Sequence, residues 1–185
     1  MKIISGKFKG SNLISPKGLF IRPTSNRAKE MIFNTLNSYI IKQNKNFSDY
    51  VVIDLFCGTG SLGIEALSRG AKKSFFIDNS DQALNICKMN CRNLNLERQT
   101  EILKINIIQC KNQFDHLSAN IFFCDPPYNS FDTDLLAKRI HNFLSANSVG
   151  VLELAKTERI REINGFDILK SKIISNSKFY FLKKI

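Results

Sequence analysis

Residues 51–63 read Val51-Val52-Ile53-Asp54-Leu55-Phe56-Cys57-Gly58-Thr59-Gly60-Ser61-Leu62-Gly63. The first six form an apolar run broken only by Asp54, which is typical of a buried strand. The glycines that follow allow a tight turn and a close approach of the backbone to a ligand. The segment therefore predicts a strand, a glycine turn and a helix, the beginning of a βαβ unit in an α/β fold.

Two kinds of cofactor fit this turn. Its glycines have the G-x-G-x-x-G spacing of dinucleotide sites, and Asp78, twenty residues after Gly58, is placed to bind ribose hydroxyls. Asp54 favours S-adenosylmethionine, because a carboxylate would repel a pyrophosphate but attract an ammonium and a sulfonium. The chain also leaves little length for a hydride-acceptor domain. A nicotinamide or flavin dinucleotide, or glycines that serve only helix packing, remain the alternatives.

Apolar and amphipathic runs alternate on both sides of this segment, as in βαβ units around a parallel sheet. Apart from the strand Val51–Phe56, strands are expected at 74–77, 101–105, 120–124 and 149–154, and helices at 25–42, 61–69, 81–93, 107–117 and 133–144. Residues 166–184 predict an antiparallel hairpin that turns at Ser175-Asn176-Ser177. The first 22 residues are expected to form short strands or loop.

A second motif, Asp125-Pro126-Pro127-Tyr128, follows the expected strand 120–124. That strand would deliver Asp125 to the carboxyl edge of the sheet, where open α/β folds bind ligands. An exocyclic amine of a nucleobase is a poor nucleophile. Asp125 and a carbonyl near Pro126 could hold its two hydrogens and direct its lone pair at a methyl donor, while Tyr128 stacks on the extruded base. A rigid turn that ends a strand is the alternative interpretation.

The charge distribution indicates a polyanionic partner. Residues 1–50 carry nine basic and two acidic residues, residues 51–149 ten of each, and residues 150–185 eight and four, for a net charge of +11. A neutral centre between basic ends predicts a nucleic-acid-binding surface built from the termini, unless these charges are merely solvated. The five cysteines suit reduced thiols in a cytoplasm. No secretion signal or apolar run of about 18 residues is found.

With these motifs the chain resembles, over essentially its whole length, the bacterial 16S ribosomal RNA guanine-N2 methyltransferases. The resemblance rests on Ile3–Gly10, Arg22-Pro23-Thr24, Arg27, Phe33-Asn34, Asp54–Gly63, Glu65–Ala71 and Asp125–Tyr128. It implies a Rossmann-like class I methyltransferase fold, with a seven-stranded, mostly parallel sheet, helices on both faces and an antiparallel C-terminal hairpin. It also implies S-adenosylmethionine as donor and a target-amine site at Asp125 through Tyr128. Cys57 stands where alanine is commoner, and Asn106 where an acid is expected.

The expected function is methyl transfer from S-adenosylmethionine to N2 of a guanine in 16S ribosomal RNA. The residues assigned to it are catalytic Asp125, Pro126, Pro127 and Tyr128; cofactor-binding Asp54, Phe56, Gly58, Gly60, Asp78, Asn79, Asn106 and Asp125; and RNA-binding Lys7, Lys9, Arg22 and Arg27. We expect one methyltransferase domain over residues 1–185, with residues 1–45 as a basic RNA-binding extension and helix. We expect a cytoplasmic monomer that contacts no membrane.

Other classes of protein fit less of the sequence. A DNA adenine or cytosine methyltransferase would share the four-residue motif but normally needs a separate target-recognition domain. A protein-glutamine methyltransferase usually has asparagine in place of Asp125. A non-catalytic RNA-binding module would explain the charge, but not Asp54, Asp78 and Asp125 together. No metal is expected, because Cys87 and Cys91 have no second pair at ligand spacing.

Overall fold

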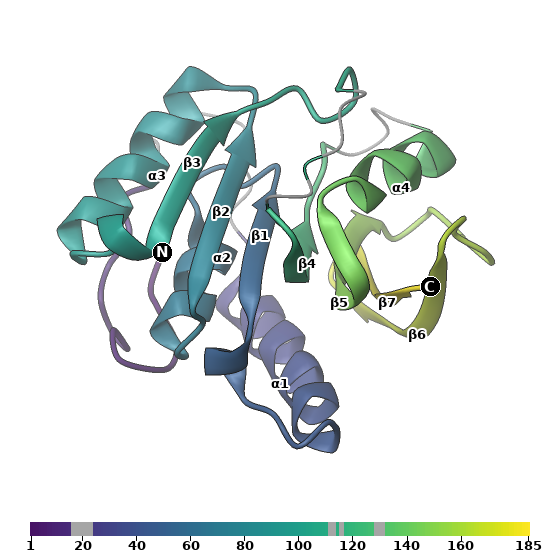
Figure 1. Ribbon diagram of the computed structural model, residues 1–185, viewed down its shortest axis with the longest axis horizontal. Coiled ribbons are helices and arrows are strands. Elements are labelled where there is room, and N and C mark those ends of the chain that lie inside the picture. Colours follow the sequence, from purple (N-terminus) through teal and green to yellow (C-terminus); the bar gives the residue numbers. More distant parts are fainter. Residues whose placement is uncertain (16–23, 111–113, 115–116, 128–131) are drawn as a thin grey trace.

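A seven-stranded sheet organises the computed structural model, which describes residues 1–15, 24–110, 114, 117–127 and 132–185 (Figure 1). Its order is β3-β2-β1-β4-β5-β7-β6. The first five strands pair in parallel, and β7 runs antiparallel between β5 and β6. The strands are β1 (Val51–Leu55), β2 (Lys73–Asp78), β3 (Thr100–Lys104), β4 (Ala119–Cys124), β5 (Leu144–Ala155), β6 (Phe166–Ile174) and β7 (Ser177–Lys184). The predicted sheet and C-terminal hairpin are confirmed.

The described residues form four α-helices that cover the sheet: α1 (Asn26–Lys42), α2 (Ser61–Ser68), α3 (Asp81–Asn93) and α4 (Thr133–His141). Two short 3-10 turns lie at Phe47–Asp49 and Glu97–Gln99. Three α-helices begin at a side-chain cap, because the oxygens of Ser25, Ser80 and Asp132 accept hydrogen bonds from backbone N–H groups of the first turn. The boundary of α3 agrees with the sequence prediction, and α1 starts one residue later than predicted.

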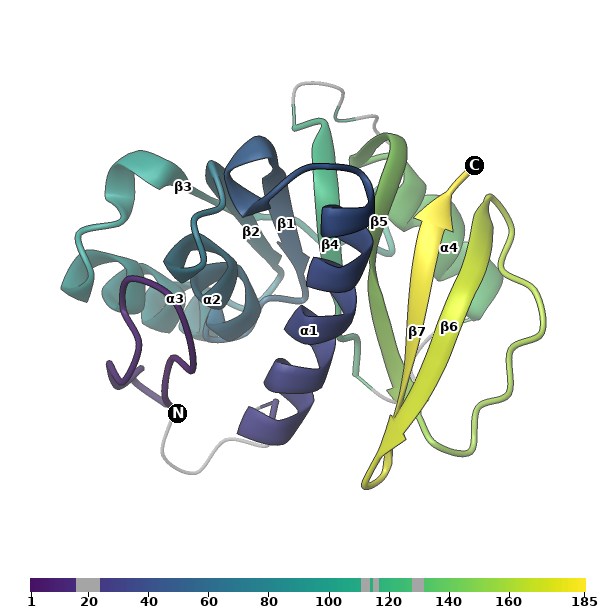
Figure 2. The same cartoon turned by 90° about the horizontal axis from the view of Figure 1, so that it is seen from below.

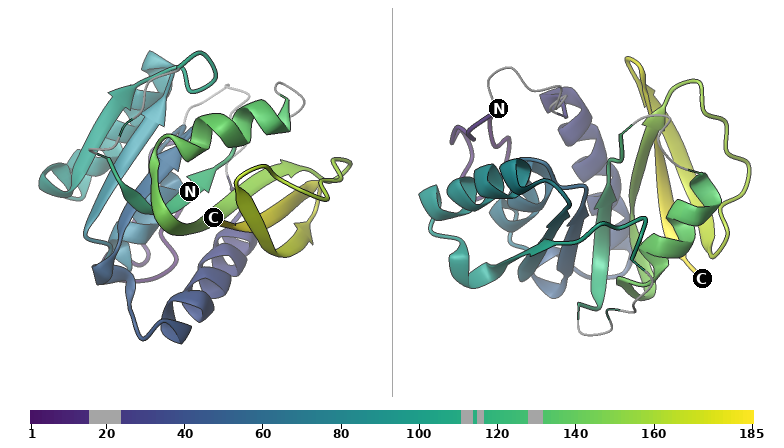
Figure 3. Two further views of the ribbon diagram at one scale, coloured as in Figure 1. Left: turned by 45° about the vertical axis from the view of Figure 1, so that its right-hand side comes forward. Right: turned by 90° about the horizontal axis from the view of Figure 1, so that it is seen from above.

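The helices lie in two layers on opposite faces of the sheet, as Figures 2 and 3 show. Helices α1, α2 and α3 cover one face, where their apolar side chains pack with Val52, Phe76 and Phe123 of the strands. Helix α4 covers the other face and packs over Ile53 and Phe122, among others. Neighbouring strand residues therefore enter different cores, so both faces of the central strands are buried, as their continuous apolar runs predict.

The predicted helix over 107–117 is wrong for the part of it that the structure describes. Residues 107–109 form a turn, closed by a hydrogen bond from the N–H of Cys110 to the carbonyl of Asn106. Phe114 stacks on Phe143 with ring centroids 4.6 Å apart, and its N–H bonds the carbonyl of Asn142. At Phe114, a hydrogen bond to the chain just after α4 thus takes the place of a helical one. Helix α4 also ends earlier than predicted, because β5 already begins at Leu144.

The amino-terminal segment, residues 1–15, docks on α2 rather than extending into solvent. The fully buried carboxylate of Glu65 accepts hydrogen bonds from the N–H groups of Ile4 (2.9 Å) and Ser5 (3.0 Å). Arg69 pairs with the same carboxylate at 2.9 Å. Gly6 lies so close to α2 that an added Cβ would fall 1.8 Å from the carbonyl oxygen of Ser68. Helix α2 therefore carries this segment on one side and the glycine turn at its start.

Candidate active site

The glycine turn is built from left-handed backbone. Phe56, Gly58 and Gly60 have φ of 58°, 54° and 80°. Such a conformation costs an ordinary residue about 1–2 kcal/mol, so Phe56 is strained at the point where β1 ends. The turn is closed by hydrogen bonds from Cys57 N–H to the carbonyl of Ile77 (3.0 Å) and from Gly60 N–H to that of Cys57 (2.8 Å). It is thereby fixed to the end of β2.

Asp54 lies beneath this turn. Gly60 is the N-cap of α2 but has no side chain to cap the helix. The Asp54 carboxylate supplies the missing acceptor and takes the N–H of Gly63 at 2.8 Å. Asp54 is only 2% exposed, and burial raises the pKa of its carboxyl to about 8, against the lowering effect of the Gly63 hydrogen bond. Asp54 thus positions the turn, and its predicted contact with the cofactor stays a prediction.

Asp78 ends β2 beside the same turn. One carboxylate oxygen accepts the N–H of Gly58 at 2.9 Å, and the other accepts the N–H of Ser80 at 3.0 Å. These bonds fix the carboxylate at the carboxyl edge of the sheet, while the side chain stays partly exposed. Each oxygen keeps a further lone pair for a ligand. The geometry is compatible with the predicted ribose contact, while the bond from Ser80 also makes Asp78 a local cap of the turn before α3.

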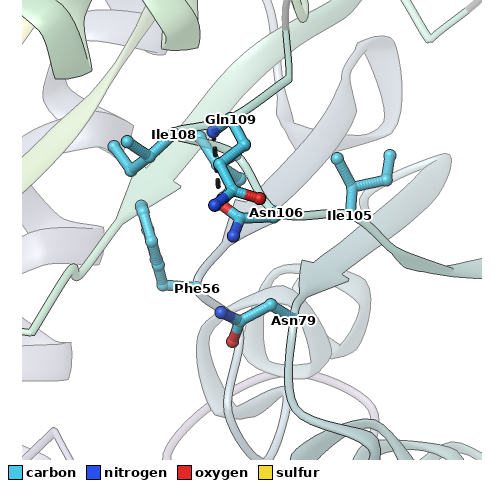
Figure 4. Close-up of a pocket in the computed structure, with 7 residues that line it drawn as sticks. Phe56, Asn79, Ile105, Asn106, Ile108 and Gln109 are labelled. Carbon is cyan, nitrogen blue, oxygen red and sulfur yellow. Dashed lines mark hydrogen bonds between the residues drawn. The ribbon is translucent and has the colours of Figure 1, made fainter.

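A pocket of about 150 Å³ lies beyond Asp78. Figure 4 shows Phe56 and Asn79 on one side of it and the turn after β3, with Asn106 and Gln109, on the other. The remaining lining residues are Ile105, Ile107 and Ile108. Asn106 accepts the N–H of Gln109 through its side-chain oxygen at 3.2 Å. Asn106 therefore stabilises the turn after β3 and lies at the rim of the pocket, and its predicted contact with the cofactor stays a prediction.

Asp125 follows β4 at the same edge of the sheet. Its N–H points to the carbonyl of Leu55 at 3.4 Å, and this continues the pairing of β4 with β1. Asp125 therefore lies beside Phe56, the first residue of the glycine turn. Pro126 is buried and Pro127 is exposed. Tyr128 lies outside the described residues, so its predicted stacking role stays a prediction.

The structure adds one acid that the sequence reasoning missed. Glu153 of β5 is 7% exposed and lies next to Asp125 in the strand register, one residue beyond the pair Cys124 and Leu152. It lines a small pocket of about 60 Å³ together with Thr24 and Ser25 before α1, and with the turn between β6 and β7. The start of α1 thus lies at the same edge of the sheet as Asp125.

The predicted RNA-binding residues do not all lie in the described chain. Lys7 and Lys9 are exposed in the amino-terminal segment, and Arg27 is exposed in the first turn of α1. Arg22 lies outside the described residues. Lys29, another cation of this region, is fully buried and donates to the carbonyl of Lys2, and burial lowers the pKa of its ammonium. Lys29 is therefore a structural residue rather than part of a binding surface.

Neither metal ligands nor a spanning segment is found in the parts of the chain that the structure describes. They contain no group of three or more His, Cys, Asp or Glu side chains arranged to hold a metal ion. None of their helices is long and apolar enough to cross a membrane. Cys57, Cys87 and Cys91 are buried, and burial raises the pKa of the Cys57 thiol to about 11. The cysteine pair of α3 thus packs in the core.

Comparison with known proteins gives a consistent result. The family model described as "Conserved hypothetical protein 95" matches residues 1–183. A "Ribosomal RNA small subunit methyltransferase D" of Buchnera aphidicola is 30% identical, over 96% of this chain and 90% of that protein. An "Uncharacterized methylase" of Rickettsia prowazekii is 28% identical, over 99% and 97%. A solved Escherichia coli structure, 23% identical, aligns over 100% of this chain and 97% of its own with a TM-score of 0.81, which shows a common fold.

Proposed function

The chain belongs to the conserved hypothetical protein 95 family, and from this membership we propose that it methylates the exocyclic N2 amine of a guanine in 16S ribosomal RNA. It is a methyltransferase with the Rossmann-like fold of the enzymes that use S-adenosylmethionine. The relative named for the small ribosomal subunit supports ribosomal RNA as the substrate. One observation carries the proposal: Asp125 and the glycine turn meet at the ends of the adjacent strands β4 and β1.

The side chains around the turn fit an adenosyl group. Asp78 offers fixed carboxylate oxygens to ribose hydroxyls. Phe56 and the isoleucines after β3 offer an apolar wall for a purine, and Asn79 and Asn106 offer amides at its rim. The bound S-adenosylmethionine supplies an electrophilic methyl group on its sulfonium. These residues hold and orient the donor and take no part in the chemistry.

Asp125 acts on the acceptor. The lone pair of a guanine N2 amine is delocalised into the ring, and carboxylate and carbonyl acceptors around its two hydrogens favour a more tetrahedral nitrogen. The Asp125 carboxylate and the carbonyl of Pro126 would provide these two acceptors. The two prolines themselves have no backbone N–H that would add a donor at this point. The methylated nitrogen is cationic and strongly acidic, so Asp125 receives its proton without needing an unusual pKa. Tyr128, three residues after Asp125, is proposed to stack on the extruded base.

The basic residues bind the rest of the RNA. Lys7, Lys9 and Arg27, which are exposed, and Arg22 are proposed to contact phosphates, with residues 1–45 as the RNA-binding extension and helix. The docking of residues 1–15 on α2 supports this, because it holds Lys7 and Lys9 on a rigid element. We propose that the protein acts as a monomer in the cytoplasm, where its substrate is made.

Mass spectrometry of ribosomal RNA nucleosides tests the proposal. Cells that lack the gene should lose one N2-methylguanosine from 16S ribosomal RNA, and the wild-type gene should restore it. The Asp125→Ala variant should lower kcat by about 10²–10⁴ with little change in S-adenosylmethionine affinity. Near-normal methyl transfer by that variant would remove Asp125 from the mechanism. Methylated adenine, cytosine or protein glutamine as the only product would instead support one of the alternative amino-methyltransferases.

A further inference from the structure

A groove lies over β5, β7 and β6, at the end of the sheet opposite β3. It has a volume of about 340 Å³ and runs between α1 and the hairpin of β6 and β7, which lie side by side in Figure 2. Its floor is formed by Val149 and Gly150 of β5 and by Phe181 of β7. Its described lining residues are Asn34, Thr35, Leu36, Ser38, Tyr39, Lys42, Val149, Gly150, Leu169, Lys170, Lys172, Phe181 and Leu182.

The charges of this groove are all of one sign. Its described lining includes Lys42 of α1 and Lys170 and Lys172 of β6, and no acidic residue. None of the three lysines forms an ion pair in the part of the chain that the structure describes. By contrast, Lys73 of β2 and Lys104 of β3, at the other edge of the sheet, each pair with an acid. Three unpaired cations along one hollow are complementary to a polyanion.

One of these cations is held in place. The ammonium of Lys172 donates to the hydroxyl of Thr35 at 3.0 Å, and that hydroxyl in turn bonds the carbonyl of Met31. The bond joins β6 to α1, so the ammonium of Lys172 lies against the helix. Tyr39 and Leu169, the latter 45% exposed, add an aromatic ring and an apolar surface. Cations combined with an aromatic ring are the elements that bind a single nucleic-acid strand.

The position of α1 connects this groove to Asp125. The helix begins beside Glu153, at the edge of the sheet where Asp125 lies, and the groove follows its second half. Its 17 residues span about 25 Å. Arg27 is exposed in the first turn and Lys42 in the last. An RNA strand that leaves the target site can therefore follow α1 into the groove.

We propose that this groove binds the phosphate backbone of the RNA that carries the target guanine. The inference rests on the proposed function and adds a second contact surface to the amino-terminal one. It brings together the basic amino-terminal and carboxyl-terminal parts of the sequence, because Lys42 comes from the first and Lys170 and Lys172 from the second. RNA flanking the guanine, rather than the guanine itself, is its ligand.

A triple variant tests this surface. Lys42, Lys170 and Lys172 are replaced by glutamine, and binding to a 16S ribosomal RNA fragment is measured between 0.05 and 0.3 M salt. Three lost phosphate contacts should reduce the slope of log K against log salt by about 2 and weaken binding by roughly 10- to 100-fold near 0.15 M salt. The affinity for S-adenosylmethionine should stay within about twofold, since the cofactor side chains are untouched. The matching lysine-to-arginine variant should bind as the wild type does.

A matched control makes the same change in charge at the other end of the sheet. Lys88, Arg92 and Arg98 are exposed on and after α3, beside β3, and their replacement by glutamine should leave the salt slope unchanged. If the groove variant keeps the wild-type slope, or loses no more affinity than the control, the groove inference is overturned. Loss of a dimer with an unchanged slope would also overturn it and assign this face to a second copy. If the wild type itself neither binds nor methylates ribosomal RNA, the proposed function fails first.

Discussion

Removal of the Glu65 side chain should detach the amino-terminal segment from the body of the protein. Glu65→Ala deletes the acceptor of the Ile4 and Ser5 amides and leaves Arg69 without its carboxylate. Hydrogen bonds to a charged group contribute about 1.5–3 kcal/mol each, and breaking a buried ion pair costs about 3–5 kcal/mol. Because the three bonds share one carboxylate, their contributions are not additive. We therefore expect the free energy of unfolding to fall by about 3–5 kcal/mol.

Urea unfolding followed by circular dichroism measures this change, and hydrogen exchange of the Ile4 and Ser5 amides locates it. Both amides should lose protection, and ribosomal RNA methylation should fall further than S-adenosylmethionine affinity does. Glu30→Ala is the matched control, because Glu30 is an exposed acid on α1, and it should change stability by less than about 0.5 kcal/mol. Intact amide protection together with a loss below about 1 kcal/mol would refute the anchoring role of Glu65.

Three further changes probe the glycine turn. Asp78→Ala removes the acceptor of two backbone amides and of the proposed ribose hydroxyls, so calorimetry should show at least about tenfold weaker S-adenosylmethionine binding; unchanged affinity would take Asp78 out of the site. Gly63→Ala places a Cβ 2.4 Å from the ring of Phe76 and should lower the free energy of unfolding by about 1–3 kcal/mol in thermal melts. Asp54 has a folded pKa of about 8, above its unfolded value of 3.8. Its stabilising contribution is therefore complete below about pH 4 and is lost as pH rises to 8, at about 1.4 kcal/mol per pH unit. Asp54→Asn should abolish this slope in unfolding curves measured across that range, and an identical slope in both proteins would contradict the raised pKa.

The sequence predicts the sheet well because its central strands are buried on both faces. Such strands appear as continuous apolar runs, and β1, β2 and β4 lie within one or two residues of their predicted ends. The predicted helix over 107–117 failed in the described part of that segment, where Ile107, Phe114 and Leu117 are buried or partly buried without being helical. Their spacing alone does not distinguish that segment from a helix. Stacking of Phe114 on Phe143, which decides the outcome, joins residues that local periodicity does not relate.

The candidate site was predictable in its location and less so in the role of each side chain. Asp54 was correctly placed at the end of β1, but its hydrogen bond to Gly63 depends on Gly60 having no capping side chain. Glu153 could have been found by the rule that identified Asp54 and Asp125, since it is an acid near the end of an apolar parallel strand. Contacts such as that of Lys172 with Thr35 join residues 137 positions apart and need the tertiary structure.

The position of β7 has a consequence for how the protein is made. Strand β7 follows β6 in sequence but lies between β5 and β6 in the sheet, and it buries Phe179, Tyr180, Phe181 and Leu182. During translation β6 emerges earlier but has no neighbour in the sheet until β7 follows, because β7 is its only partner among the strands that the structure describes. A chain that lacks β7 would therefore have an open edge at β5 and an apolar surface exposed on both faces of the sheet. Selection against truncations that remove β7 should thus be as strong as selection against truncations in the centre of the sheet.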